Sequence, residues 1–440
     1  MSLWKLLKRL FSGTRDPEPK PAARAEARPR PPGNPFPESA PAVIVHREEV
    51  IDGRPGIAGY VFRAARPRPG APLSPLDRLA ALSEDHVAEF AQRRLALIPL
   101  AVEDWLAADF RPLIAPHAVL LIAPPTDFTD APAWLAQVQA IRQAGARVGL
   151  EHGTIARIPE ATASADWVTL ELKACPFDDF ERLTQWFLAE HPRLALAVTG
   201  VSSWAEHRLC QVLGARYSIG DFATRPDEDM PRDSLGQSRL VLMEMLNLLR
   251  RDAPSTELAA VAKRDPGVVA KIVEMANSPL SGLSEPVAGL DQALMVLGRE
   301  VLYRWMAMGL FRANGGKRDA LLLEIALRRA RFLEVIGSGS LPKLQCDELF
   351  LVGMFSVFDS LLGLPLEAVI ERIHLPRAVV EVLLSNAGPY GRYLSLALAM
   401  EKGHGAQIAK LAETLKLPLA TLRAADIEAL AWADAALRAG

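Results

Sequence analysis

Cysteine and histidine are both scarce in this chain. Three cysteines occur in 440 residues, at Cys175, Cys210 and Cys346, far apart and without a paired spacing. This pattern excludes a disulfide framework, argues against a zinc site and is typical of a reducing compartment. None of the eight histidines is followed by aspartate. The chain therefore lacks simple metal-ligand signatures, and we expect no cofactor.

Long apolar runs and an excess of charge of one sign are also absent. No hydrophobic stretch reaches the ~20 residues that a membrane-spanning helix requires. The formal net charge of −2 gives no general attraction to nucleic acid, so we expect no nucleic-acid partner. The sequence has no Walker loop, no GxGxxG after a strand and no GxSxG motif.

The chain is instead rich in hydrophobic residues, which make up 50% of the sequence. Its 440 residues are enough for two or three domains. Its first segment, residues 1–41, is an exception. Residues 1–11, MSLWKLLKRLF, can form about three turns of a basic amphipathic helix. Residues 12–41 contain nine prolines and predict an extended, disordered tether.

Two interpretations of this terminal helix stay open. It can contact an anionic membrane or a partner's groove, or it can be a marginal helix that is disordered alone or packs on its own protein. The N-terminus lacks a small-residue cleavage site after a continuous apolar core, which argues against a secretory signal. We therefore predict a cytoplasmic protein, with peripheral contact at the inner face of the membrane as one role for the helix.

Residues 42–228 alternate short apolar runs, such as 96–102 and 194–200, with helical patterns, such as 133–145 and 177–191. Continuous apolar strands separated by helices predict a parallel sheet that is covered on both faces. About seven such strands favour a closed barrel over an open sheet. A TIM-like barrel takes about 250 residues, so this shortened α/β barrel must lack some helices.

Residues 229–440 predict an all-α domain. After Pro231 the strand patterns stop, and glycine and proline punctuate a series of perhaps ten helices. Ser234 can cap the first of them. Asp265 and Pro266 have the types preferred at the N-cap and the first position of a helix.

The stretch from about residue 235 to 430 resembles the HDOD domain of bacterial signalling proteins. The matching elements are a helix ending in RDP (264–266), the helix VVAKIVEMANS (268–278), a turn with Gly282, and an apolar helix ending in Leu297-Gly298. HDOD domains resemble HD hydrolases but lack their metal ligands, which are several converging His and Asp side chains. After residue 207 the sequence contains two histidines, His374 and His404. A hydrolase in this half is therefore not expected.

An α/β domain before an HDOD domain resembles the EAL-plus-HDOD proteins, which join a shortened EAL-type barrel to HDOD. EAL domains hydrolyse cyclic di-GMP with metal ions held by carboxylates and an Asn at strand ends, where a barrel places its site. The resemblance puts these ligand positions on residues that mostly cannot bind metal. They are Val61 for the signature Glu, Pro99 for the Asn, Leu121 or Pro124 for the next Glu, Thr169 for the Lys, Thr199 and Ser202 for the late Glu motif, and Ile219 for the Gln.

Glu151 and His152 fall on the adjacent aspartate pair of the EAL pattern. One carboxylate and one imidazole cannot hold two metal ions around a phosphodiester. We therefore interpret them as a strand-end Glu and His satisfied by neighbours or water, and the barrel as degenerate and non-catalytic. Lost ligands do not exclude binding, and Arg63 and Asp221 are candidate contacts for phosphate and guanine. A surface Arg and a loop Asp are the alternatives.

The resemblance implies a protein-interaction adaptor or regulator that docks a signalling protein through its HDOD domain. One alternative is a sensor that binds cyclic di-GMP or another nucleotide without hydrolysis. A second is a cyclic di-GMP phosphodiesterase. An adaptor with a large apolar helical surface can also form a homodimer.

Overall fold

The computed structural model describes residues 43–67, 72–124, 130–174, 176–229, 236–277, 287, 289–313 and 315–439. The predictions for the amphipathic segment 1–11, the tether 12–41 and the capping residue Ser234 lie outside these ranges.

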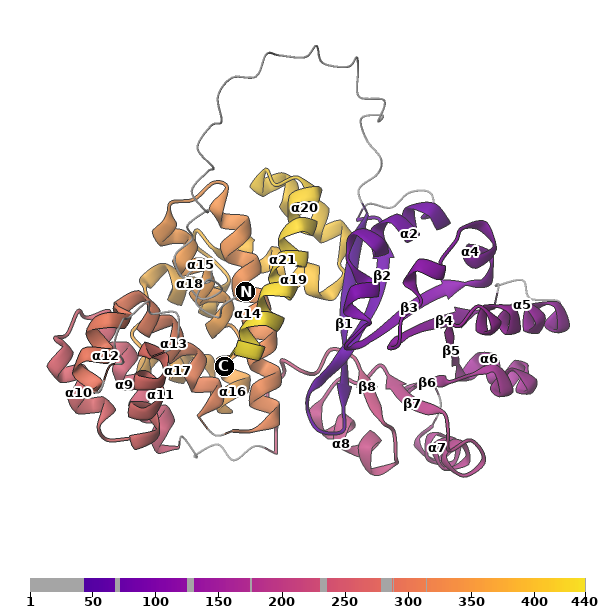
Figure 1. The fold of residues 1–440 in the computed structure, drawn as a ribbon, viewed down its shortest axis with the longest axis horizontal. Coiled ribbons are helices and arrows are strands. Elements are labelled where there is room, and N and C mark those ends of the chain that lie inside the picture. Colours follow the sequence, from indigo (N-terminus) through magenta and orange to yellow (C-terminus); the bar gives the residue numbers. More distant parts are fainter. Residues whose placement is uncertain are drawn as a thin grey trace, which may run out of the picture.

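The first half of the chain is a closed barrel in which the strands follow one another in sequence order (Figure 1). Its strands are β1 (Ile44–Asp52), β2 (Ile57–Ala65), β3 (Leu95–Ala101), β4 (Ala118–Ala123), β5 (Arg147–Glu151), β6 (Trp167–Glu171), β7 (Ala195–Thr199) and β8 (Tyr217–Ile219). The predicted α/β barrel is confirmed.

Two details of the prediction are wrong. The barrel has eight strands rather than about seven, and β1 runs antiparallel to both of its neighbours, β2 and β8. Residues 53–56 connect β1 directly to β2. A connection this short can form only an antiparallel hairpin, because a parallel pair needs a crossover of a dozen or more residues. The missing helix of this shortened barrel is therefore the one between β1 and β2.

The barrel's own helices pack on the outside of the sheet. They are α2 (Pro75–Glu84), α3 (Val87–Phe90), α4 (Val102–Ala107), α5 (Ala131–Gln143), α6 (His152–Arg157), α7 (Phe177–Glu190) and α8 (Trp204–Val212). Ser74, Asp130 and Ser203 cap α2, α5 and α8 by accepting hydrogen bonds from backbone amides of the first turn. These caps fix where three of the helices begin.

The second half is helical throughout its described residues. Its helices are α9 (Gln237–Arg250), α10 (Ser255–Ala262), α11 (Pro266–Ala276), α12 (Leu290–Leu297), α13 (Arg299–Arg312), α14 (Lys317–Ser338), α15 (Lys343–Phe355), α16 (Phe358–Leu362), α17 (Leu366–Arg372), α18 (Arg377–Ser385), α19 (Gly391–Lys402), α20 (Gly405–Leu415) and α21 (Leu419–Ala439). These thirteen described helices exceed the ten expected, because short helices such as α16 and α17 carry too few turns to show a period. Asp265 caps α11 as predicted, by accepting from Gly267 and Val268.

The helical half lies against the β1–β2 wall, to which the barrel itself contributes helix α2. Helices α19 and α21 pack on β1, and α14 makes hydrogen bonds to Tyr60 of β2 and Glu49 of β1 (Figure 1). Buried side chains of both halves belong to one continuous hydrophobic cluster, whereas the barrel interior forms a second cluster of its own. The second half therefore covers the β1–β2 wall together with α2.

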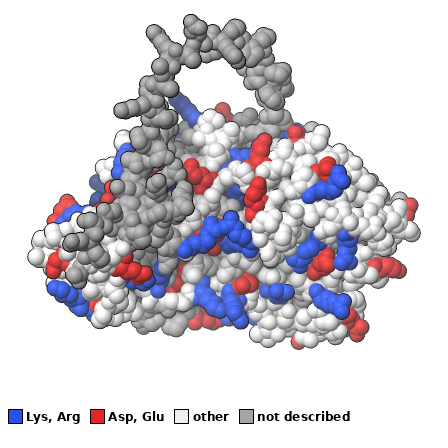
Figure 2. All heavy atoms as spheres, in the orientation of Figure 1, with Lys and Arg blue, Asp and Glu red and all other residues white. Residues whose placement is uncertain are grey.

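Lysine and arginine are interspersed with aspartate and glutamate on the face that Figure 2 shows, without a large field of one sign. Within the described ranges, no helix is both long and apolar enough to span a bilayer.

Candidate functional site at the barrel mouth

The mouth of the barrel lies where the carboxyl ends of the parallel strands meet. The ladder pairs Pro99 with Leu121 and Glu151 with Thr169. Pro99, Leu121 and Thr169 each stand two positions after a residue of the interior cluster, namely Leu97, Val119 and Trp167. Glu151 stands two positions after Gly149, where an added Cβ would meet the side chains of Leu121, Val119 and Trp167. Since alternate residues of a strand face the same side, the predicted positions on these strands face the interior of the barrel.

Val61, Thr199 and Ile219 share this inward register on β2, β7 and β8. The sequence-predicted positions on the strands therefore all face the interior of the barrel. Val61, Thr169 and Ile219 are buried, Pro99, Leu121 and Thr199 are half-buried, and Glu151 is exposed. The floor of the mouth is thus largely apolar, and it offers few of the oxygen ligands that a hard cation requires.

Glu151 and His152 do not act as a pair, because they lie on opposite sides of the barrel wall. Glu151 ends β5 and faces the mouth, whereas His152 begins α6 and its ring packs edge-on against Phe187 of α7, 6.1 Å between centroids. Burial lowers the pKa of His152 below its usual value. The alternation of a strand puts consecutive side chains on opposite faces, so adjacency in sequence separates them.

Two further carboxylates at the mouth were not singled out in the sequence. Glu171 ends β6 and is exposed beside Thr199 in the ladder. Glu206 of α8 accepts hydrogen bonds from the backbone amide of Ser202 at 2.6 Å and from its hydroxyl at 2.9 Å. Lys173 lies 3.4 Å from the same hydroxyl. Ser202 is therefore held in a local network and is not free to take a ligand.

Arg63 and Glu48 face each other across the β1–β2 hairpin at the mouth. Their side chains form an ion pair of 3.8 Å, and that of Arg63 is 49% exposed. Burial raises the pKa of Glu48, and the charge of Arg63 opposes that rise. Arg63 thus keeps guanidinium donors directed to solvent.

Asp221 connects the rim of the mouth to the helical half. Its carboxylate accepts from Lys402 of α19 at 3.2 Å and from Arg225 at 3.3 Å. Partial burial opposes ionisation, but the hydrogen bond and charge of Lys402 hold the pKa of Asp221 below its usual value. The predicted contact to guanine would have to compete with these two cations.

Metal-binding clusters are not found among the described residues, where no group of three or more His, Cys, Asp or Glu is placed to hold an ion. His374 follows α17 and His404 precedes α20, so they come from different turns of the helical half. Cys210 and Cys346 are buried free thiols.

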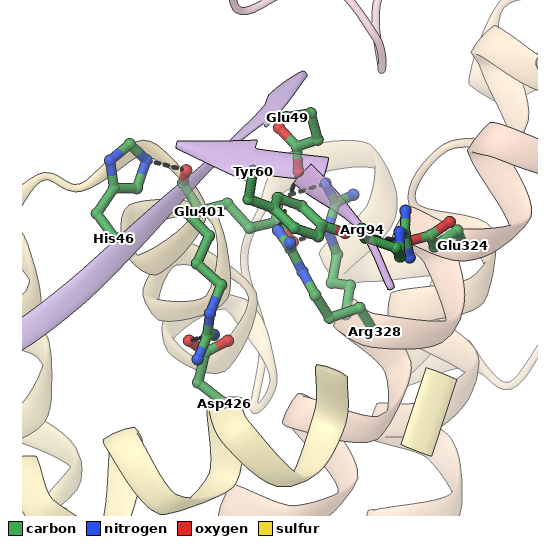
Figure 3. A network of polar contacts seen from close by, with 10 residues as sticks. His46, Glu49, Tyr60, Arg94, Glu324, Arg328, Glu401 and Asp426 are labelled. Atoms are coloured by element: carbon green, nitrogen blue, oxygen red, sulfur yellow. Dashed lines mark hydrogen bonds and ion pairs between the residues drawn. The ribbon is translucent and has the colours of Figure 1, made fainter. Parts of the chain in front are cut away.

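The outer face of the β1–β2 wall holds a set of charged contacts to the helical half that the sequence analysis missed (Figure 3). Arg328 of α14 donates to Glu49 at 3.1 Å. Glu324, one turn earlier, accepts from the hydroxyl of Tyr60 at 3.1 Å and from Arg94 at 2.7 Å. The signal in the sequence is the run of three charged residues inside a buried strand, Arg47 to Glu49, which must place charge on both faces of the wall.

Arg47 and Arg423 extend this contact around one buried carboxylate. Arg47 donates to Asp85 at 2.6 Å and pairs with Asp426 of α21, while Arg423 of α21 reaches Asp85 at 2.9 Å. Burial raises the pKa of Asp85, and the two arginines counter it. The ion pairs fix the register of α21 on the barrel, since an unpaired buried charge is costly.

The helical half matches the HDOD domain family over residues 237–356. This chain carries an HDOD domain. The expectation drawn from the sequence is confirmed for these helices, α9 to α15. They include the RDP turn before α11 and the long helix α14 that contacts the barrel.

Two curated proteins are similar to the chain. One is the cyclic di-GMP phosphodiesterase CdgJ of Vibrio cholerae, 23% identical over 268 residues, which cover 61% of this chain and 62% of CdgJ. The other is the uncharacterized protein YuxH of Bacillus subtilis, 27% identical over 165 residues, 37% of this chain and 40% of YuxH. The matched segments thus span less than two thirds of either relative.

Among solved structures, the EAL domain of Mycobacterium smegmatis DcpA is similar to 41% of this chain over 90% of its own length. The identity is 15% and the TM-score 0.33. The HDOD match, the relation to CdgJ and the closed barrel together give the chain the EAL-plus-HDOD architecture that the sequence predicts.

Proposed function

We propose that this protein is a non-catalytic regulator in cyclic di-GMP signalling, with an EAL-type barrel that does not hydrolyse the nucleotide and an HDOD domain that docks a signalling protein. The observation that supports the proposal is that Pro99, Leu121 and Ile219 face the interior of the barrel and are apolar, at positions that the resemblance assigns to polar ligands. A two-metal phosphodiesterase site needs several converging oxygens to hold the ions that activate water.

The proposal places the protein in the cytoplasm and takes residues 42–228 as the barrel and 229–440 as the HDOD domain. Residues 1–41 serve as a tail whose first eleven residues contact a membrane or a partner. The HDOD domain engages a kinase, a diguanylate cyclase or another signalling enzyme, or a second copy of the chain.

Hydrolysis of cyclic di-GMP by the purified full-length chain, with Mg²⁺ or Mn²⁺, tests the absence of catalysis. We expect no metal-dependent turnover. The relation to CdgJ makes this assay decisive, because that relative is named as a phosphodiesterase. Turnover that is lost in Glu151→Ala, but not in a variant of the exposed Glu190 on α7, would overturn the proposal.

Crosslinking in cells of the source organism tests the partner. We expect a specific protein, or a second copy, to be crosslinked through the HDOD domain in the full chain and to be lost when residues on the exposed faces of that domain are changed. Recovery of no specific product would contradict the adaptor role.

A nucleotide sensor is the second candidate, and the half-exposed guanidinium of Arg63 at the mouth is the observation that favours it. Calorimetric titration with cyclic di-GMP in magnesium buffer tests this role. Saturable binding at micromolar or tighter affinity, about −8 kcal/mol, that weakens in Arg63→Ala would establish a sensor. If no heat is released at high ligand concentration, the adaptor role remains as the single candidate function.

A further inference from the structure

We propose that the turn between α19 and α20, residues 402–405, is a clamp on the rim of the barrel mouth, through which a change at the mouth reaches the HDOD-containing half. Only the idea that the transmitted change has a regulatory role rests on the proposed function. The mechanical link itself follows from contacts that need no ligand.

The turn meets the barrel rim at three places. Lys402 pairs with Asp221 at 3.2 Å. The ring of His46, at the start of β1, points toward α19 and its Nε2 lies 2.7 Å from the carbonyl oxygen of Glu401 (Figure 3). At Gly405, an added Cβ would lie 2.9 Å from the Cα of Pro67, just beyond β2.

Gly403 is required in this turn for two independent reasons. Its φ of +65° lies in the left-handed region, and a Cβ there would meet the ring of His46 at 2.8 Å. The first reason is local and common to many turns. The second couples the turn to the barrel, because any side chain at 403 has to displace His46 or withdraw α19.

Glu401 joins the rim to the centre of the helical half. Its main chain accepts from His46, while its carboxylate receives two hydrogen bonds from Arg329 of α14, at 2.8 and 2.6 Å. Arg329 also donates to Ser356 at the end of α15, at 2.7 Å. Glu401 thus contacts the barrel with its backbone and α14 with its side chain, and Arg329 links that side chain to the end of α15.

A cavity of about 390 Å³ lies beside the clamp and gives the turn room to move. Residues 220–224 line it from the barrel, and α14, α19 and the start of α20 line it from the helical half. A packed interior resists small displacements, whereas a turn that borders a cavity can shift without overlapping its neighbours.

Hydrogen–deuterium exchange of the full chain tests the clamp with two glycine variants. Gly403→Ala should accelerate exchange in β1 and in residues 216–224 by roughly tenfold. Gly315→Ala is the matched control, because Gly315 has a similar φ of +64° and no atom near the added Cβ. Equal effects of the two variants on the barrel, or no effect of Gly403→Ala there, would overturn the proposal.

The reverse direction is tested from the barrel side. Asp221→Asn should accelerate exchange in α19 and α20, and Asp227→Asn, which breaks a pair with Arg208 inside the barrel half, should not. In Gly403→Ala, the further change His46→Ala should reverse part of the acceleration in residues 216–224, because it removes the overlap with the added Cβ but also loses the contact to Glu401. Failure of these couplings would refute the clamp without bearing on hydrolysis or partner binding, which are measured separately.

Discussion

Two adjoining walls of the same barrel are covered in opposite ways. Over β8, the barrel's own helix α8 packs an aromatic layer in which His207 stacks on Phe222, with ring centroids 5.2 Å apart, and meets Trp204 edge-on. The charged group of Arg318 of α14 also meets these rings, and it lies over Trp204 rather than in an ion pair with this layer. Over β1 and β2, helices of the other domain make ion pairs such as Arg328–Glu49. The strands β1 and β8 are neighbours in the sheet, so their position in the barrel does not explain the difference.

The difference reflects how the position of the covering helices on the strands is determined in each case. A helix joined to its strand by a short loop is positioned by the chain, and apolar packing suffices to hold it. The helical domain can dock in many orientations, and buried charges penalise all those that leave a charge unpaired. We call the β1–β2 wall with its ion pairs, such as Arg328–Glu49 and Arg47–Asp85, the ionic wall. These ion pairs therefore define the arrangement of the two halves.

The largest expected effect comes from breaking the ionic wall. Arg328→Met removes a cation whose side chain is 6% exposed and leaves the carboxylate of Glu49 buried without its partner. We expect a loss of about 3–5 kcal/mol in the free energy of unfolding, measured by urea denaturation. Adding Glu49→Gln should recover part of that loss.

Arg264→Met provides the control, because its pair with Glu244 is nearly half exposed and should contribute less than about 1 kcal/mol. Similar losses in Arg328→Met and Arg264→Met would show that the wall is not a buried ionic contact.

The free energy of unfolding should fall in acid because of His207 in the aromatic layer over β8. Burial lowers the pKa of His207 to about 4, and its Nδ1 lies 2.9 Å from the hydroxyl of Ser218. Because the folded-state pKa lies below the ordinary value of 6.5, the contribution to stability is complete above pH 6.5 and is lost as the pH falls toward 4. The loss should be on the order of 2–3 kcal/mol, since the unfolded chain takes up the proton more readily.

Thermal unfolding between neutral pH and about pH 4 measures this effect. His207→Gln should flatten the pH dependence, whereas His117→Gln, at an exposed position, should leave it unchanged. If the stability of wild type and of His207→Gln depends on pH in the same way, the aromatic layer around His207 is already hydrated in the folded protein.

A smaller effect is expected from one hydroxyl of the ionic wall. Tyr60→Phe removes the hydrogen bond to Glu324, while Arg94 still donates to that carboxylate. The free energy of unfolding should fall by about 1 kcal/mol. Tyr303→Phe is a matched control, because the hydroxyl of Tyr303 is buried without a hydrogen-bond partner among the described residues. Its removal should be neutral or slightly stabilising.

The smallest effect is expected at the rim. Lys402→Met breaks a pair in which both side chains are about half exposed, and it should cost at most about 1 kcal/mol. Thermal unfolding at low and at high salt should show the difference from wild type shrinking as salt screens the pair. A large effect that is independent of salt would mean that Lys402 acts through packing.

Much of the barrel could be predicted because its strands are continuous apolar runs separated by helices of period 3.6. The antiparallel β1 could not be recognised in this way, since VIVHREEVI carries the pattern of a strand but no sign of its direction. The short connection to Gly59 and its neighbours in β2 is what imposes the hairpin. The helical half was predicted as a class, but α16 and α17 are too short to be read from a period.

The mouth was predicted in part. The resemblance located positions such as Pro99, Leu121 and Ile219, and the register of the strands turns all three toward the interior of the barrel. Glu171 and Glu206 were missed, because a charged residue at the end of a strand or the start of a helix is common in sequences. Whether such a residue faces a mouth depends on the closure of the barrel.

By itself the sequence determined the two kinds of secondary structure, the order of the halves and the residue types at the mouth, because local periodicity and composition carry this information. The tertiary structure alone decided that the ring of His152 packs against Phe187 of α7, and that Arg47 and Glu49 serve the contact between halves. It also decided that Gly403 lies on the ring of His46. These relations join residues far apart in the chain, and no local pattern encodes which distant surface a side chain will meet.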